Sequence, residues 1–182
     1  MSRKQINIPK VLEFSWLKTE KLTETIHALK HKKLKQFLDM IENVYLDLMK
    51  VFYNNLTLDG KNLVLYVKGI KMKISNDVWN SVAGIKYSRL KVGKGNTNGI
   101  HEFNKIQYYR SCVRNPTQSV NRFHVGNMNL TPRLIPYIIE WQLIPKGTNH
   151  DVLHEEDLIL LYCIMNQIKV NWVYIIMEHM LK

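Results

Sequence analysis

Two histidines four residues apart, His150 and His154, form the arrangement in this chain closest to a metal site. Histidines at positions i and i+4 share one face of a helix, and their ring nitrogens are common ligands of Zn²⁺. The acids Glu155, Glu156 and Asp157 follow directly and offer oxygen ligands. However, the helical pattern begins only after His150, and no glutamate stands between the histidines as a general base. We therefore interpret the histidines as loop and cap residues, and the acids as first-turn residues favoured by the helix dipole.

Catalysis of other kinds finds no support in the pattern of residues. Cys112 and Cys163 have no histidine at a defined distance, as a thiol nucleophile would need. The run GKGNTNG at 93–99 lacks the GxxxxGK[ST] order of a phosphate-binding loop, so we interpret it as a flexible connector. The DTG or DSG loop of an aspartic protease and the YxDD turn of a polymerase do not occur. We expect a protein that is not an enzyme and needs no metal or other cofactor.

Lysines dominate the charge of the chain, which is formally +11 at pH 7. Residues 1–100 carry 18 Lys and Arg against 8 Asp and Glu, whereas residues 101–182 carry 8 against 7. The basic N-terminal half could attract the phosphates of nucleic acid, so we take its lysines as the candidate binding residues. The set is Lys30, Lys32, Lys33, Lys35, Lys71, Lys73, Lys91 and Lys94. The alternative is that they only keep helix surfaces solvated, because arginine is the better bidentate phosphate ligand.

Arginines and aromatic residues are interleaved between residues 108 and 123. Tyr108, Tyr109 and Phe123 stand beside Arg110, Arg114 and Arg122. Rings next to cations are typical of single-strand nucleic-acid surfaces, but the commoner interpretation is edge packing with solvated charge.

Helices predicted from the apolar spacing must position most of these residues. Residues 1–20 lack a period and predict a flexible arm, followed by one helical domain over 21–182. Apolar residues from Leu34 to Phe52 recur at intervals of three and four. This spacing predicts one long amphipathic helix with its apolar stripe towards the core.

A small antiparallel hairpin is predicted next. Two β-prone runs, 62–67 and 70–74, flank Lys68 and Gly69. In the second run Ile70, Met72 and Ile74 alternate with lysines, so we expect the apolar face to be buried and the lysine face to be solvated.

A short helix and a loop follow the hairpin. Ser75 is the expected N-cap of the helix, and Gly84 its end. The Gly/Lys/Asn-rich stretch 86–101 then predicts a mobile loop, and a short helix is expected around 103–109.

The last third of the chain, residues 130–182, predicts three helices. Thr131 before Pro132 is the expected N-cap of the first, which should end near Pro145. The second begins near His154 and is apolar almost all round, so it should be the central helix. Asn171 is the expected N-cap of the third.

These elements predict a mainly α (α+β) fold, a helical domain with one small antiparallel β-hairpin and a C-terminal three-helix segment. No run of about 18 uncharged apolar residues occurs, and the first twenty residues lack a signal-peptide pattern. The two cysteines do not form a disulfide framework. We therefore expect a soluble, intracellular protein that does not associate with membranes.

Short motifs in the same order carry a family resemblance. They are FYNNL at 52–56, VKGI at 67–70, LIP at 143–145 with His150, and LLY at 160–162 followed by IKVN at 168–171. Together they resemble the putative plant transposon protein domain over about Phe37 to Met180. The sequence departs from the family pattern at 102–129, where no motif aligns. It also departs at Asn166 and Gln167, where a glycine would be usual after the central helix.

The resemblance implies an origin in a plant mobile element and carries over no catalytic residue. We expect a non-enzymatic domain of plant retrotransposon origin that acts as a protein- or nucleic-acid-interaction module. Its expected partners are nucleic acid or another protein encoded by the element. The alternative is a basic nucleic-acid-binding protein that uses the Lys-rich N-terminal half.

Overall fold

The computed structural model describes residues 14–20, 22–31, 34–40, 45–93, 100, 103–146 and 150–181. Within these ranges the helices are α1 (Phe14–Thr19), α2 (Thr23–His31), α3 (Lys35–Leu38), α4 (Leu46–Asn55), α5 (Asn76–Ala83), α6 (Lys105–Cys112), α7 (Leu130–Ile138), α8 (Glu155–Met165) and α9 (Trp172–Leu181). The short turns η1 (Val125–Asn127) and η2 (Ile139–Leu143) lie before and after α7. The strands are β1 (Thr57–Asp59), β2 (Asn62–Val67), β3 (Ile70–Ile74), β4 (Phe123–His124) and β5 (Val152–Leu153). The mainly α, α+β class is confirmed, with two small antiparallel sheets.

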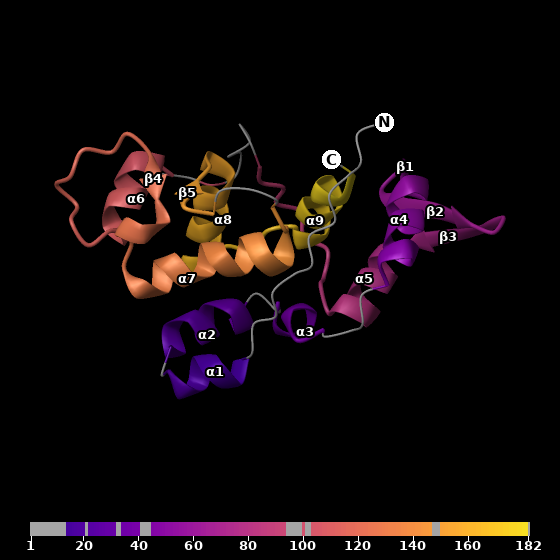
Figure 1. The fold of residues 1–182 in the computed structure, drawn as a ribbon, viewed down its shortest axis with the longest axis horizontal. Coiled ribbons are helices and arrows are strands. Elements are labelled where there is room, and N and C mark those ends of the chain that lie inside the picture. The colour runs from indigo at the N-terminus through magenta and orange to yellow at the C-terminus, as the bar shows by residue number, and fades with distance from the viewer. Residues whose placement is uncertain are drawn as a thin grey trace.

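Helix α8 lies at the centre of the helical body (Figure 1). Its residues Leu158, Ile159, Leu160 and Leu161 are all buried, because α2, α6 and α7 pack around it. A helix that is apolar on every side can only be stable when neighbours cover every side. The predicted central position of this helix is therefore confirmed.

The caps of the flanking helices follow the sequence in one case and not in the other. Asn171 precedes α9, and its Oδ1 accepts a hydrogen bond from the Tyr174 N–H at 3.0 Å, as predicted. The sequence predicts Thr131 as the N-cap of α7, but the helix begins at Leu130, so its N-cap is the extended residue Asn129, two residues earlier. The Thr131 hydroxyl instead donates to Glu24 Oε2 on α2 at 3.3 Å. The prediction of Thr131 as N-cap is therefore wrong.

The long helix predicted from Leu34 to Phe52 is two helices. Leu34 and Leu38, around α3, are buried in the core, whereas α4 has no buried residue. Tyr45 has an extended backbone (φ −97°, ψ 96°) and separates α4 from what precedes it. Apolar spacing cannot reveal this break, because the interval of three and four is the same on a helix against the core and on one against a sheet.

Helix α1 lies inside the segment 1–20 that the sequence predicts to be an unstructured arm. Leu17 is completely buried, and its carbonyl accepts a hydrogen bond from the Leu22 N–H at 2.9 Å, where α2 follows. Residues 14–19 are therefore helical, because Leu17 packs with the hydrophobic core. The division of the chain into an arm and one domain stays a prediction.

The predicted hairpin is confirmed, but the predicted burial of Ile70 and Met72 on its apolar face is wrong, whereas Ile74 is half-buried against the core. β2 and β3 pair in the order β1-β2-β3, and the turn residues Lys68 and Gly69 have φ of 49° and 80°. Two consecutive positive φ values are what a type I′ hairpin turn needs. Ile70 is 68% exposed and Met72 43% exposed, because α4 contacts β2 and leaves β3 at the sheet edge.

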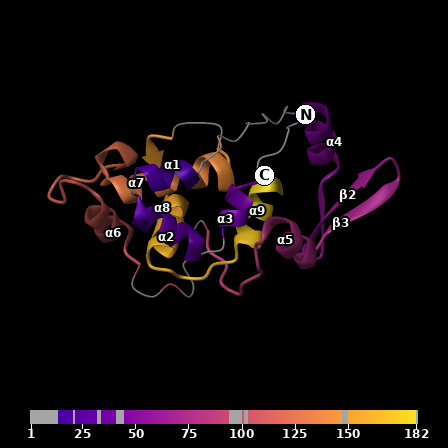
Figure 2. The same cartoon turned by 90° about the horizontal axis from the view of Figure 1, so that it is seen from below.

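Helix α4 and the three-stranded sheet lie together at one end of the molecule, away from α6, α7 and α8. Both views show this, so the separation does not result from overlap in one projection (Figure 1, Figure 2). Helix α5 follows β3 at the base of the sheet, with Trp79 buried and Gly84 as the predicted left-handed C-cap. In the described part of the chain, no helix has the length and apolar character needed to cross a bilayer.

Gln167 occupies a backbone conformation that favours glycine. Its φ is +57°, just after α8, where the family resemblance predicts a glycine. We expect Gln167→Gly to raise the free energy of unfolding by about 0.5–1 kcal/mol. A non-glycine residue in the left-handed region costs about 1–2 kcal/mol, and glycine offsets part of this gain because it raises the conformational entropy of the unfolded chain. Urea unfolding followed by circular dichroism measures the change.

The neighbouring residue is the matched control for this substitution. Asn166 has φ −91°, and its Nδ2 donates to the Tyr162 carbonyl at 2.9 Å. Asn166→Gly should therefore lower the stability. Equal effects of the two glycine substitutions would contradict the conformational argument.

Candidate functional site

Exposed apolar side chains are concentrated on α4 and the three-stranded sheet. In the described part of the chain, 16 large hydrophobic residues are exposed, and 8 of them lie between residues 45 and 74. They are Tyr45, Leu46, Leu48, Val51, Leu58, Tyr66, Ile70 and Met72, which we call the α4–sheet surface. Such a concentration on one small unit marks an interaction site more often than scattered apolar residues do.

The geometry of α4 explains why its part of this surface is exposed. Met49, Phe52 and Tyr53 are half-buried, and burial raises the pKa of the Tyr53 hydroxyl. These residues occupy one side of the helix, whereas Leu48 (63% exposed) and Val51 (42%) lie on its flank. Since α4 contacts β2 and has no fully buried residue, it uses only part of its apolar surface within the fold.

The sheet has one charged face and one apolar face. Lys71 Nζ lies 3.0 Å from Asp59 Oδ2, across β2. This hydrogen bond, and then the charges of Lys71 and Lys73, lower the pKa of the Asp59 carboxyl. Tyr66 is paired with Lys71 and lies on the same face. Leu58, Ile70 and Met72 therefore share the opposite, apolar face with Leu63 and Leu65 of β2. The two β2 residues are buried, whereas Leu58, Ile70 and Met72 on the outer strands are exposed.

The structure brings two of the predicted nucleic-acid-binding lysines together. Lys71 and Lys73 are on one face of β3. The others with described positions lie on different elements: Lys30 on α2, Lys35 on α3 and Lys91 in the loop after α5. Helix α2 lies well away from β3 in both views (Figure 1, Figure 2). Lys32, Lys33 and Lys94 lie outside the described residues, so the set as a whole stays a prediction.

Two of these separate lysines already have partners in the fold. Lys35 forms an ion pair with Asp39 one helical turn away. Lys91 Nζ lies 4.6 Å from the centre of the Tyr174 ring on α9, within cation–π range. Lys71 on β3 is likewise paired, with Asp59. What distinguishes β3 is that it carries two of the predicted lysines on one face.

The aromatic residues of 108–123 are packed inward. Tyr109 is 2% exposed, and its hydroxyl donates to the His124 carbonyl at 2.8 Å. The centre of the Tyr108 ring lies 4.9 Å from that of the Tyr162 ring on α8. Burial raises the pKa of the Tyr108 hydroxyl. The Tyr108 ring packs α6 against α8, and the Tyr109 ring packs against Phe123. Both arrangements agree with edge packing rather than a base-stacking surface.

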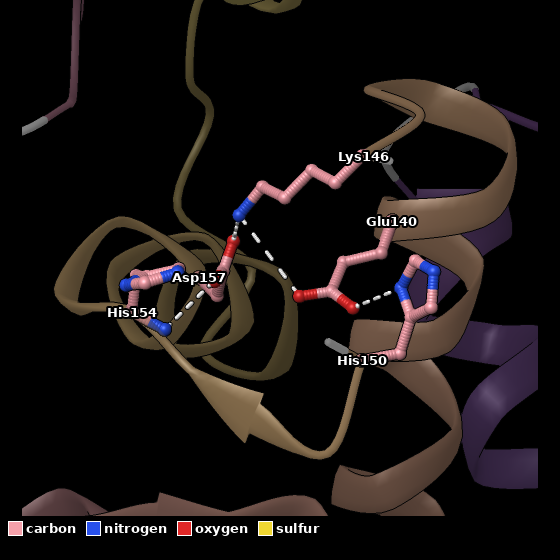
Figure 3. Close-up of polar contacts among 5 residues, drawn as sticks. All are labelled: Glu140, Lys146, His150, His154 and Asp157. Atoms are coloured by element: carbon pink, nitrogen blue, oxygen red, sulfur yellow. Dashed lines mark hydrogen bonds and ion pairs between the residues drawn. The ribbon is translucent and has the colours of Figure 1, made fainter. Parts of the chain in front are cut away.

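A buried polar cluster that the sequence does not predict lies between η2 and α8 (Figure 3). Glu140 is 2% exposed, and its Oε2 lies 2.9 Å from His150 Nδ1. Lys146 Nζ lies 3.9 Å from Glu140 Oε1 and also forms an ion pair with the completely buried Asp157. The other carboxylate oxygen of Asp157 accepts a hydrogen bond from the His154 N–H at 2.9 Å. Asp157 is therefore the helix-start residue we expected and, in addition, half of a buried ion pair.

The electrostatics of Glu140 combine two opposing effects. Burial raises the pKa of its carboxyl, and the hydrogen bond from His150 lowers it, with a net rise. The His150 ring is held in place by stacking on Trp141, with ring centres 4.2 Å apart. The cluster thus ties the segment after η2 to the start of α8 through groups that neutralise one another.

The cluster lies beside a cavity of about 220 Å³ that Lys146 also lines, with Glu156, Glu178 and His179. Among the described residues, no three His, Cys, Asp or Glu side chains gather closely enough to hold a metal ion. Glu155, one of the nominal metal ligands, pairs instead with Lys105 at 3.0 Å on the surface. Because Lys146 is already bound to two carboxylates, its charge is committed to the fold.

Removing the cation of the buried cluster should strongly destabilise the protein. Lys146→Met leaves Glu140 and Asp157 buried without their counter-ion, and we expect the free energy of unfolding to fall by about 3 kcal/mol. The matched control is Lys105→Met, which breaks the exposed pair with Glu155. That variant should lose less than about 1 kcal/mol. Urea unfolding of both variants measures the difference, and similar losses would contradict a buried, committed ion pair.

The raised pKa of Glu140 predicts a pH dependence of stability. The folded protein holds the Glu140 proton more tightly than the unfolded chain, whose glutamate has a pKa of 4.5. The contribution of Glu140 to folding stability is therefore fully present below pH 4.5, and it is lost as the pH rises through the raised pKa of Glu140 in the folded protein. Glu140→Gln should remove this decline, so the variant gains on the wild type as the pH increases from about 4.5 towards neutrality.

Replacing the partner of Glu140 provides the control. His150→Phe removes the hydrogen bond that lowers the Glu140 pKa, so the decline should extend to higher pH. Chemical unfolding at a series of pH values reports all three curves. Parallel curves for the wild type and Glu140→Gln would show that Glu140 does not cause the dependence.

Comparison with known proteins places most of this structure within one family. A family model described as putative plant retrotransposon-related domain matches residues 30–182. No curated protein and no solved structure matches the chain. The matched region contains both the α4–sheet surface and the buried cluster, and it bears out the resemblance drawn from the short motifs.

Proposed function

The chain belongs to the putative plant retrotransposon-related domain family, and from that premise we propose that it is a non-enzymatic protein-interaction domain. The observation that carries the proposal is the α4–sheet surface, which holds half of the exposed large hydrophobic residues described. A unit of α4 and three strands buries only Leu63, Val64 and Leu65 completely. Its remaining apolar area is available to a partner.

The buried cluster supports the non-enzymatic part of the proposal. Glu140, His150, Lys146 and Asp157 are bound to one another or to the start of α8. Titratable groups that serve a reaction need a face towards a substrate. Here the two carboxylates are almost completely buried and the cation lies between them, which is the arrangement of a structural link.

The chemistry of the α4–sheet surface favours a protein over nucleic acid as the partner. Ile70, Leu48 and Leu58 are each more than half exposed. Burial of aliphatic side chains against another protein lowers the free energy of the complex, whereas contact of these side chains with phosphate groups contributes little to binding. The nucleic-acid alternative is therefore treated as an outcome of the test below.

A library of random peptides displayed on phage tests the proposal directly. We expect the wild type to enrich peptides, and the variant with Leu48→Ser, Leu58→Ser, Ile70→Ser and Met72→Ser to lose about tenfold or more of that binding. The control carries Ile106→Ser and Leu130→Ser, two exposed apolar residues outside the surface, and should bind as the wild type does. Circular dichroism checks that each variant is folded.

Two results would overturn this proposal. The wild type could enrich no peptide, or the four-residue variant could enrich the same peptides equally well. Filter binding of single- and double-stranded oligonucleotides over a range of salt concentrations covers the alternative. Binding that falls steeply with salt and is lost in Lys71→Gln/Lys73→Gln would assign the surface to nucleic acid.

A further inference from the structure

Strand β3 has an open hydrogen-bonding edge. In the described chain the sheet order is β1-β2-β3, so β3 pairs on one side with β2 and with no described strand on the other. Val67 and Ile70 are opposite each other across the two-residue turn. In such a hairpin this closing pair is hydrogen-bonded, and bonded and non-bonded pairs alternate from there. The backbone groups of Ile70 and Met72 therefore face β2, whereas those of Lys71 and Lys73 face outward.

We propose that β3 accepts an extended acidic segment of a partner protein as an additional antiparallel strand. The inference rests on the proposed protein-interaction function and names the class of partner and its mode of binding. Strand addition gives affinity through backbone hydrogen bonds and specificity through alternate side chains. On β3 the donors and acceptors offered are those of Lys71 and Lys73.

The register of β3 determines the sequence pattern of this partner. Residues directly opposite one another on neighbouring antiparallel strands place their side chains on the same face. Partner residues opposite Lys71 and Lys73 would lie on the charged face, where aspartate or glutamate forms favourable cross-strand pairs. Partner residues opposite Ile70 and Met72 would lie on the apolar face and cover side chains that are now 68% and 43% exposed. The partner therefore alternates acidic and apolar residues.

Charge complementarity selects an acidic partner over a second copy of the chain. Residues 57–74 contain four lysines and one aspartate. Two β3 strands paired edge to edge would place lysines opposite lysines, and like charges in directly opposite positions are destabilising. Lysines on an edge strand are also a common device against self-association. The same lysines thus exclude a second copy and admit a strand of opposite charge.

Lys73 is the residue best placed to read this charge. Lys71 already donates a hydrogen bond to Asp59, whereas Lys73 acts on that carboxylate only through its charge. Both side chains are exposed on the edge strand. An incoming acid opposite Lys73 therefore meets a cation that forms no hydrogen bond to Asp59.

Synthetic peptides of alternating valine and glutamate test the inference by fluorescence anisotropy. We expect the valine–glutamate peptide to bind the full chain at least about tenfold more tightly than a valine–lysine peptide of the same length. N-methylation of the glutamate amides, which would point at β3, should abolish binding. N-methylation of the valine amides, which point away from β3, should leave it unchanged.

A charge reversal on β3 provides the second arm of the experiment. Lys73→Glu should weaken binding of the glutamate peptide and favour the lysine peptide. The control is Lys50→Glu, on an exposed lysine of α4 that pairs with Asp47, and it should leave the preference unchanged. Equal binding of both peptides, indifference to glutamate N-methylation, or a preference unaffected by Lys73→Glu would each overturn strand addition.

The two proposals fail in different ways. Phage peptides that depend on the α4–sheet surface but lack alternating acids, together with indifference to N-methylation, would retain the protein-interaction function and remove strand addition. Failure of both the phage selection and the synthetic peptides would remove both.

Discussion

The burial of helix α8 on every side is the constraint on which the rest of the structure depends. Its apolar residues, from Leu158 to Ile164, require α2, α6 and α7 as cover. The same burial takes the carboxylate of Asp157 out of water at the start of the helix. An unpaired buried charge would cost several kcal/mol, so Lys146 and the N–H of His154 must reach it. The segment after η2 is positioned by this requirement.

The molecule therefore divides its physical tasks between two regions. In the described helical body, the residues of the apolar core are covered, and the buried carboxylates of Glu140 and Asp157 lie in ion pairs with Lys146. In the unit formed by α4 and the sheet, Ile70 and Leu48 remain in water, and the lysines of β3 lie on the face of the sheet opposite Ile70. The proposed recognition function rests on this unit, because half of the exposed large hydrophobic residues described are concentrated there.

The sequence predicts features that depend on neighbouring residues and fails where distant residues decide. Asn171 as a cap and α8 as the central helix follow from local patterns, and both are confirmed. The break before α4 is not predictable, because its apolar interval matches that of α3. Glu140 is an acid within an apolar run, in the π-helical turn η2. No local pattern predicts its contact with His150, which follows ten residues later in the chain. The exposure of Ile70 is not predictable for a related reason, because alternation indicates two faces of a strand but not whether another element covers either face.

The absence of any fully buried residue in α4 has a consequence for how the molecule opens. Segments with few buried apolar groups exchange their amide hydrogens through local fluctuations of low free energy, whereas core helices exchange only when the whole domain unfolds. Helix α4 and β3 thus belong to the least protected part of the fold, and α8 to the most protected. A ligand that binds the ordered form of this unit would slow its opening by mass action while leaving exchange in α8 almost unaltered.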